Sequence, residues 1–171
     1  MPELITSNYS KETFPELFTL RFGMTKAEVK TVYQKRGLKP IFERTKRLDF
    51  IYPPIDVPGA TESNTIFDKD GHLIEVAQYF DVDGDDASAF KHIAKYRDLK
   101  DQLTAKYGTP ECIEFMDDQY NNGERRAEGF KIKRGNYACL WRNVNRSMDV
   151  FLVLGGDHLD ILLRLTYKQT A

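Results

Sequence analysis

An alternating apolar pattern near the C-terminus constrains the fold more than any other feature of this sequence. It runs through "MDVFLVLGGDHLDILLRLTYK", residues 148–168. Side chains at every second position of a β-strand point to the same face. The positions on the apolar face are Met148, Val150, Leu152, Leu154, Leu159, Ile161, Leu163, Leu165 and Tyr167. The pattern predicts an antiparallel hairpin, turning between Gly155 and His158, at the centre of a sheet.

A helix with both ends marked is predicted in "FGMTKAEVKTVYQKRG". Thr25 is a suitable N-cap residue, and Glu28, three residues later, completes a capping box. Val29 and Tyr33 belong to an apolar stripe along one side, and Gly37 ends the helix. The helix is therefore expected to pack through one face.

A second helix is predicted from about Ser88 to Tyr107, and like the first it ends at a glycine, Gly108. Each helix is followed by segments with strand periodicity, including a hairpin at Asp70-Gly71 after the first. The chain therefore reads as a weak internal duplication, with units of about 14–80 and 86–168. We expect the whole chain of 171 residues to form one compact α+β domain. About eight antiparallel strands would form one sheet, with the helices on one face.

Two polar segments, "PPIDVPGATESN" and "DDQYNNGERRAEG", are expected to be exposed loops. A turn is also expected near Gly135. Beyond that turn, Tyr137, Cys139 and Trp141 share one strand face, which is predicted to be core rather than a partner-binding strip.

The two cysteines, Cys112 and Cys139, lack the C-x-x-C spacing of metal and redox motifs. A single disulfide or two buried thiols remain. Both cysteines fall in alternating strand patterns, where cysteine behaves as a small hydrophobe, and this favours buried thiols.

Charge and hydropathy exclude two classes of function. The formal net charge is -1, and no stacking aromatic residues are interleaved with the basic clusters Lys46-Arg47 and Arg125-Arg126, so no nucleic-acid partner is expected. No apolar run approaches the roughly 18 residues of a membrane-spanning helix, and the first residues lack the features of a secretory signal. The protein is expected to be cytoplasmic, or periplasmic if a leader has been removed from the chain.

The sequence carries no motif of catalysis or cofactor binding, and its three histidines are scattered. His158 and Asp160 could pair as a base and its orienting group, but a solvated turn histidine is the simpler interpretation. "DVDGDDAS" begins like a calcium-binding loop, yet His92 stands where the bidentate glutamate belongs. Its carboxylates are instead expected to stabilise the start of the second helix. We therefore expect no enzyme activity, catalytic residue, metal or cofactor.

Both helix ends resemble known protein-binding modules. Gly23-Met24-Thr25-x-x-Glu28-Val29 and Tyr107-Gly108-Thr109-Pro110 resemble the helix-plus-strands modules of the bacterial SmpA/OmlA (BamE-like) lipoproteins. They are also similar to the tandem modules of the β-lactamase inhibitor protein (BLIP-like). The resemblance implies a non-enzymatic protein that binds other proteins through a sheet face or through loops.

Clustered carboxylates on two loops give that expectation a concrete form. Such clusters steer basic partners by long-range attraction, so the first hypothesis is an inhibitor or immunity-type protein that blocks a basic toxin or enzyme. The alternative is an envelope-associated scaffold or assembly protein with an apolar or aromatic partner surface. Both leave the oligomeric state open. The partner-binding residues of the first hypothesis are Asp81, Asp83, Asp85, Asp86, Asp117, Asp118, Glu124 and Glu128.

Overall fold

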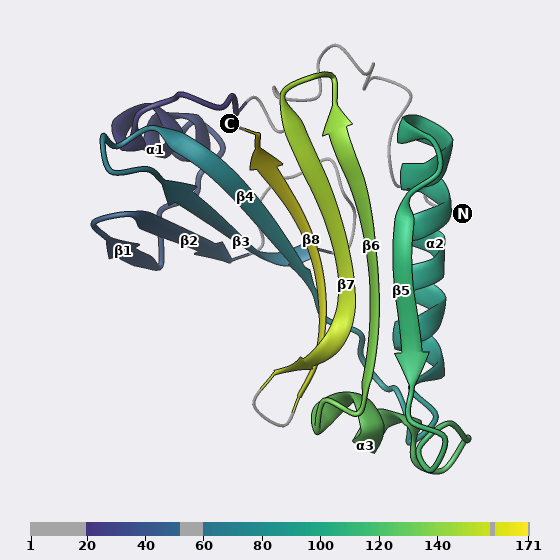
Figure 1. Ribbon diagram of the computed structural model, residues 1–171. Helices are drawn as coiled ribbons and strands as arrows, with labels where there is room; N and C mark the ends of the chain where they lie inside the picture. Colours follow the sequence, from purple (N-terminus) through teal and green to yellow (C-terminus); the bar gives the residue numbers. More distant parts are fainter. Residues whose placement is uncertain (1–19, 52–59, 158–159, 171) are drawn as a thin grey trace. The chain divides into compact units, whose positions relative to one another are not determined.

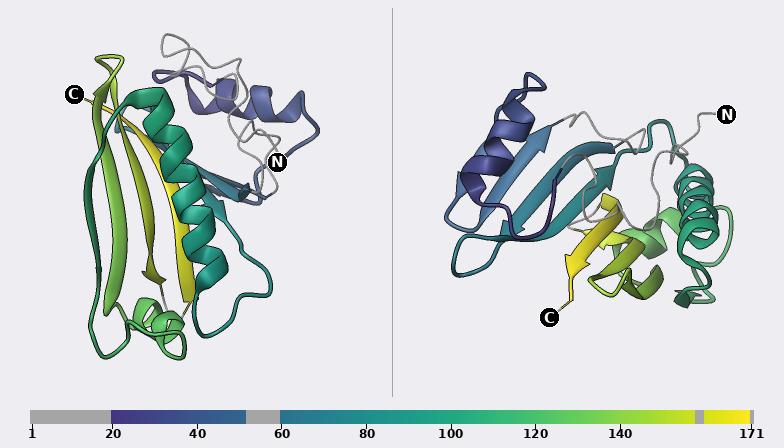
Figure 2. Two further views of the ribbon diagram at one scale, coloured as in Figure 1. Left: turned by 90° about the vertical axis from the view of Figure 1, so that its right-hand side faces the viewer. Right: turned by 90° about the horizontal axis from the view of Figure 1, so that it is seen from above.

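The computed structural model describes residues 20–51, 60–157 and 160–170. Three helices and eight strands lie in these residues (Figures 1 and 2). The helices are α1 (Lys26–Gln34), α2 (Phe90–Tyr107) and α3 (Arg126–Lys131). The strands are β1 (Phe42–Arg44), β2 (Arg47–Ile51), β3 (Ala60–Phe67), β4 (Leu73–Phe80), β5 (Glu111–Met116), β6 (Gly135–Val144), β7 (Met148–Asp157) and β8 (Asp160–Gln169).

The strands form an antiparallel sheet in the order β1-β2-β3-β4-β8-β7-β6-β5. The predicted α+β class is confirmed, and β7 and β8 are the two arms of the C-terminal hairpin. The turn begins later than predicted, because Gly155 still belongs to β7. His158 and Leu159 lie outside the described residues. The buried members of the alternating pattern are Met148, Val150, Leu152, Leu154, Leu163, Leu165 and Tyr167.

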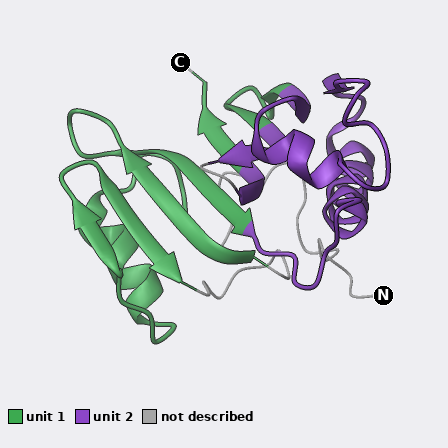
Figure 3. Cartoon of the chain, turned by 90° about the horizontal axis from the view of Figure 1, so that it is seen from below, with its two compact units in different colours: residues 1–79, 142–150, 166–171 green, residues 80–141, 151–165 purple. Residues whose placement is uncertain are grey.

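The chain divides into two compact units (Figure 3). The first contains residues 1–79, 142–150 and 166–171, and the second contains residues 80–141 and 151–165. Helix α1 and strands β1 to β3 belong to the first unit, whereas α2, α3 and β5 belong to the second. All the residues predicted to bind a partner lie in the second unit.

Helix α1 starts as its sequence predicts. The Thr25 side chain accepts a hydrogen bond from the Glu28 amide, and the Glu28 carboxylate accepts one from the Thr25 amide at 2.7 Å. Val29 and Tyr33 are buried, and the Tyr33 ring stacks on Phe50 in β2 with 3.8 Å between ring centroids. The capping box and the apolar face are both confirmed.

We predict that Thr25→Ala lowers the free energy of unfolding by about 1 kcal/mol, because it leaves a first-turn amide without its side-chain acceptor. Urea denaturation monitored by circular dichroism measures the change. The matched control is Thr31→Ala, which changes an exposed threonine in the interior of the same helix. It is expected to change the free energy of unfolding by less than about 0.5 kcal/mol. An unchanged midpoint for Thr25→Ala would contradict the capping-box interpretation.

Helix α2 packs through the face that its periodicity predicts, along the strands of the second unit (Figure 2, left). Its buried side chains are Ile93, Tyr96, Leu99 and Leu103. Phe90 falls at the same helical spacing as these residues but is 69% exposed. At the other end, the Trp141 indole N–H donates to the carbonyl of Gly108 at 2.8 Å. This hydrogen bond joins the C-terminal end of α2 to the face of β6 that was predicted to be core.

Three local predictions differ in part from the structure. The polar segment 117–129 is not wholly a loop, because α3 begins within it and buries Ala127 and Phe130. The turn predicted near Gly135 lies just before it, at residues 132–133, and Gly135 itself begins β6, where it pairs with Met116 of β5. The segment "PPIDVPGATESN" ends in strand β3 from Ala60 onward. The residues of that segment before Ala60 lie outside the described residues.

Candidate protein-binding surface

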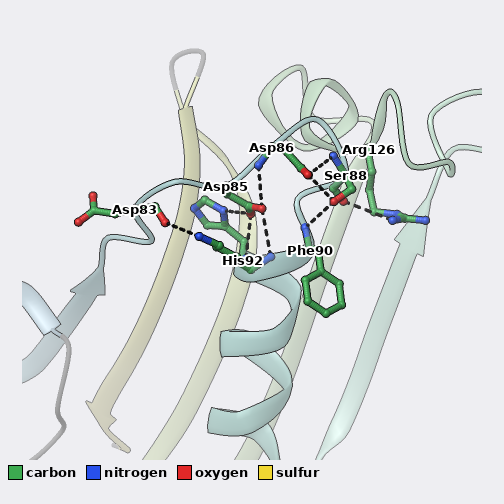
Figure 4. A network of polar contacts seen from close by, with 8 residues as sticks. Asp83, Asp85, Asp86, Ser88, Phe90, His92 and Arg126 are labelled. Carbon is green, nitrogen blue, oxygen red and sulfur yellow. Dashed lines mark hydrogen bonds and ion pairs between the residues drawn. The ribbon is translucent and has the colours of Figure 1, made fainter.

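The acidic loop between β4 and α2 is built around Asp85 (Figure 4). One oxygen of its carboxylate accepts hydrogen bonds from the amides of Asp86 and Lys91, at 2.9 and 3.1 Å. The other accepts from the amide of His92 at 3.0 Å and lies 2.6 Å from His92 Nδ1. Only 7% of the Asp85 side chain is exposed. Asp85 therefore holds the start of α2 and is not free to meet a partner.

The residues between Asp85 and the start of α2 are held by a short chain of hydrogen bonds. Asp86 accepts hydrogen bonds from the amide and hydroxyl of Ser88, and the Ser88 hydroxyl accepts one from the amide of Phe90 at 3.1 Å. These contacts explain why α2 begins at Phe90, two residues later than predicted. They also leave the Phe90 side chain outside the helix face that packs.

The hydrogen bonds that Asp85 accepts lower the pKa of its carboxyl. Burial alone would raise the pKa of this carboxyl, but the donated hydrogen bonds from His92, Lys91 and Asp86 outweigh burial and lower the pKa to about 2. An unfolded aspartate titrates near 3.9. Because the folded pKa is depressed, the resulting stability is present above about pH 4 and is lost as the pH falls through about 2.

We predict that the natural protein and Asp85→Asn differ less in free energy of unfolding at low pH. The difference should fall by about 2 kcal/mol when the pH falls from about 5 to about 2. The reason is that only the natural protein has the low-pKa carboxyl of Asp85 to protonate. Urea denaturation across this pH range measures both proteins. Asp83→Asn, which changes an exposed carboxyl of the same loop, is the control variant. If the difference in free energy of unfolding between the natural protein and Asp85→Asn did not change with pH, the carboxylate would not be what holds the helix.

Two hollows in the second unit bring the acidic segments together. The first, of about 460 Å³, is lined by loop residues including Asp81, Asp83, Asp85 and Asp86, with Lys131 of α3 on its wall. The second, of about 540 Å³, is lined by Asp85, Asp86, Glu124 and Glu128, again with Lys131. Asp85, Asp86 and Lys131 thus belong to both hollows. We call these two hollows and their carboxylates the acidic surface.

Helix α3, which the sequence did not predict, joins the two acidic segments. The amide of Ala127 donates to the carbonyl of Ala87 at 2.9 Å, and the Arg126 guanidinium donates to the carbonyl of Ser88 at 3.3 Å. Glu128 is paired with Arg125, whose Nε and Nη2 lie 3.0 and 3.2 Å from its two oxygens. A short amphipathic run, "RAEGFK", with buried Ala127 and Phe130, was the signal that could have revealed this helix.

Asp117 and Asp118 do not line either hollow. They follow strand β5, where the amide of Asp117 donates to the carbonyl of Arg134 at 2.8 Å. The eight predicted partner-binding residues therefore separate into six around the two hollows and two at the end of β5.

A disulfide joins Cys112 of β5 to Cys139 of β6, so the preference for two buried thiols is wrong. The two residues are direct partners in the strand register, with 4.2 Å between their Cα atoms. Cys139 is buried, but Cys112 is exposed. The sequence placed both cysteines in strands, but it did not show that these strands are neighbours in this register.

Glu114 lies beside the disulfide and faces α2. Its Oε1 accepts hydrogen bonds from Tyr96 Oη at 2.8 Å and from Lys100 Nζ at 2.6 Å. Burial raises the pKa of Glu114, but these two hydrogen bonds overcome that effect and hold it below its usual value. The ligand atoms of Cys112, Glu114 and Cys139 lie within 4.8 Å of one another. The disulfide leaves neither sulfur as a thiolate, which is the form that binds metal ions.

Comparisons with known proteins do not add a relative. No protein-family model, curated protein or solved structure matches this chain. None of the helices in the described part of the chain has the length and apolar character needed to cross a bilayer.

Proposed function

We propose that this chain is a non-enzymatic protein-binding module of the inhibitor or immunity type, which blocks a basic partner protein such as a toxin or enzyme. The observation that carries the proposal is the acidic surface, where carboxylates from segments 81–86 and 124–128 line adjoining hollows. Carboxylates outnumber the cationic Lys131 around these hollows, and an excess of one charge on a concave surface attracts a basic patch of a partner. The proposal includes no catalytic residue, metal, cofactor or nucleic acid.

Its fixed geometry supports the acidic surface as a docking site. Asp85 anchors the loop to α2, and the hydrogen bond between Ala127 and Ala87 anchors it to α3. Asp81, Asp83 and Asp86 stay exposed on this fixed frame. A surface that is already ordered loses little conformational entropy when a partner binds. Asp117 and Asp118 would add to the same negative field from the end of β5.

The modular architecture belongs to the same proposal. The capping box of α1 and the glycine stop of α2 are the features that resemble tandem SmpA/OmlA (BamE-like) and BLIP-like modules. We propose that the chain consists of two such helix-then-strands repeats with helices on one sheet face. This resemblance is the reason for preferring a binding protein to an enzyme.

The disulfide favours the alternative, an envelope-associated scaffold or assembly protein, in one respect. Disulfides persist in oxidising compartments such as the periplasm and are rare in the reducing cytosol. The Cys112–Cys139 bond therefore supports a periplasmic location over the cytoplasmic one. An inhibitor that acts in the periplasm would agree with both the acidic surface and the disulfide.

The first experiment identifies the partner by charge. The natural protein and a triple variant, Asp81→Asn, Asp83→Asn and Asp86→Asn, are used as paired baits in extracts of the native host, followed by mass spectrometry. Asp85 is kept because it holds α2. A control variant with Asp70→Asn, Asp98→Asn and Asp101→Asn carries the same change of net charge at other exposed positions. We expect a basic protein that the natural and control baits capture and the triple variant captures weakly.

Association kinetics with that partner then test the proposal. We predict that the triple variant associates about tenfold more slowly than the natural protein at low salt, and that the difference shrinks at high salt, because exposed charges act mainly on encounter. Stopped-flow measurements at two salt concentrations give both quantities. An association rate that the triple variant leaves unchanged would remove the acidic surface from the interface.

A further inference from the structure

The disulfide and Glu114 form a compact set of metal-ligating groups on strands β5 and β6. Cys112 and Glu114 are two residues apart in β5, so their side chains point to the same face of the sheet. Cys139 lies directly across from Cys112 in β6 and shares that face. The two sulfurs and a carboxylate oxygen lie within 4.8 Å of one another. The strand register thus gathers three donor groups into one place.

The spacing of these donors suits a zinc ion once the disulfide is reduced. Zinc–sulfur and zinc–oxygen bonds are about 2.3 and 2.0 Å long, so donors on one tetrahedral zinc ion lie about 3.5 to 3.8 Å apart. Glu114 Oε1 is 3.7 Å from Cys139 Sγ, which is already within that range. Cys112 is exposed on the last strand of the sheet, so rotation of its side chain brings its sulfur to a similar distance.

Glu114 is held in position by two residues of α2. Tyr96 Oη and Lys100 Nζ both donate hydrogen bonds to Glu114 Oε1, at 2.8 and 2.6 Å. Hydrogen bonds from outside the ligand set orient a metal-binding carboxylate, and losing them usually weakens metal binding. Tyr96 Oη also lies 3.2 Å from Cys139 Sγ, so one tyrosine contacts two of the three donors. The carboxylate therefore needs little ordering when an ion binds.

Charge favours a divalent ion in the reduced protein. Two thiolates and the carboxylate carry three negative charges, and the sulfur of one of them belongs to Cys139, which is only 2% exposed. Lys100 supplies one positive charge and a divalent ion supplies two, so the ligands, Lys100 and the ion are neutral together. Thiolates select zinc over magnesium and calcium, which prefer oxygen donors. In the oxidised protein the only charged donor is Glu114, which is already paired with Lys100.

We propose that Cys112, Cys139 and Glu114 bind one Zn²⁺ ion when the disulfide is reduced, with water as the fourth ligand. A dithiol supplies the electrons: it loses two electrons and two protons and becomes a disulfide, while the two cysteines become thiols. Zinc then displaces both thiol protons, which pass to water. The inference does not rest on the acidic surface, because none of the three residues lines the two hollows.

The ion and the disulfide are alternative cross-links between β5 and β6. Disulfides persist in oxidising compartments, whereas the cytosol keeps thiols reduced. The disulfide would join the two strands in the periplasm, and zinc would join them in the cytosol. The same three residues thus stabilise the β5–β6 ladder in either redox state.

Cobalt titration of the reduced protein is the first test. The natural protein is reduced with dithiothreitol, freed of reductant without oxygen, and titrated with Co²⁺, whose bonds to thiolates give a charge-transfer band in the near ultraviolet. We expect the band to saturate at one Co²⁺ per chain and to disappear when Zn²⁺ is added. Ca²⁺ and Mg²⁺ should leave the band unchanged. The oxidised protein is the control and should give no band.

Variants assign the ligands. Competition with a zinc-binding dye should give a dissociation constant for Zn²⁺ below about 1 μM in the reduced natural protein. Cys112→Ser should abolish the cobalt band, and Glu114→Gln should weaken zinc binding by about tenfold or more. Glu111→Gln is the matched control, because it makes the same change on the opposite face of β5, and should bind zinc like the natural protein. Circular dichroism of each oxidised glutamine variant checks that it folds.

Denaturation shows whether the folded strands form the site. Zn²⁺ should raise the urea midpoint of the reduced protein toward that of the oxidised protein, because the ion binds the folded form more tightly than the unfolded form. A chelator should reverse the shift, and the oxidised protein should not respond to Zn²⁺. If zinc bound the reduced protein without raising its midpoint, the ion would be binding thiols of the unfolded chain instead.

Three further results would overturn the inference. The first is the absence of a thiolate band in reduced protein titrated with Co²⁺. The second is equal zinc affinity in Glu114→Gln and Glu111→Gln, which would remove the carboxylate from the site. The third is one ion for every two chains together with a zinc-dependent dimer in sedimentation velocity, since two chains would then share the ion.

Discussion

Removing the Cys112–Cys139 disulfide is expected to lower the free energy of unfolding by about 3 to 4 kcal/mol. The bond closes a loop with a sequence separation of 27 residues. In the chain-entropy account, such a crosslink restricts the unfolded chain far more than the folded one, which already holds the two strands together. The loop includes α3 and the carboxylates at 124 and 128, so the bond stabilises the segment that completes the acidic surface.

Urea denaturation of the oxidised protein, the reduced protein and the double variant Cys112→Ser and Cys139→Ala measures this effect. Reduced protein and double variant should unfold at similar urea concentrations, both well below the oxidised protein. Adding reductant to the double variant is the control and should change nothing. Equal midpoints for oxidised and reduced protein would show that the bond contributes no stability, and two free thiols in protein purified under oxidising conditions would show that it does not form.

Phe130→Ala is expected to destabilise the protein by about 3 to 5 kcal/mol, the usual range for deleting a buried phenylalanine side chain. Phe130 has no exposed surface, and its ring packs nearly perpendicular to that of Tyr137 in β6, with 5.2 Å between the ring centroids. Deleting the ring leaves a cavity under α3, which is too short to be stable without that contact. The segment around Lys131, which lines both hollows, should then become disordered.

Thermal and urea denaturation measure the loss of stability, and hydrogen exchange at the amides of α3 reports the loss of local order. Phe90→Ala removes the same side chain from an exposed position in the same unit and is expected to cost less than about 1 kcal/mol. If both substitutions cost the same, burial of Phe130 is not what holds α3. Basic partners that bind the acidic surface should also bind Phe130→Ala more weakly than Phe90→Ala.

Much of the fold is predictable because its signals are local. The capping box of α1 depends on two side chains and two amides within four residues, so its sequence signature is sufficient. The hairpin of β7 and β8 follows from strict alternation, because a shift of one residue would expose Leu152 and Leu154 to water. Helix α2 could be predicted over most of its length because its buried residues recur every three or four positions. They are Ile93, Tyr96, Leu99 and Leu103.

The candidate site is predictable only as a set of residues and not as an arrangement. The clustering of Asp81, Asp83, Asp85 and Asp86 is visible in the sequence, but the inward orientation of Asp85 is not. That orientation depends on the amides of Lys91 and His92, six and seven residues further along the chain. Nothing in the local pattern separates Asp85 from its exposed neighbours.

The sequence by itself determined the elements whose stability comes from neighbouring residues: capped helices, glycine stops and two-residue alternation. The tertiary structure decided which distant segments meet. It paired Cys112 with Cys139, formed α3 around Phe130, brought 124–128 beside 81–86, and left β5 at the edge with Ile113 and Phe115 exposed. The physical reason is that strand register and side-chain burial depend on the whole core, since each contact between distant segments must offset the entropy of closing the chain between them.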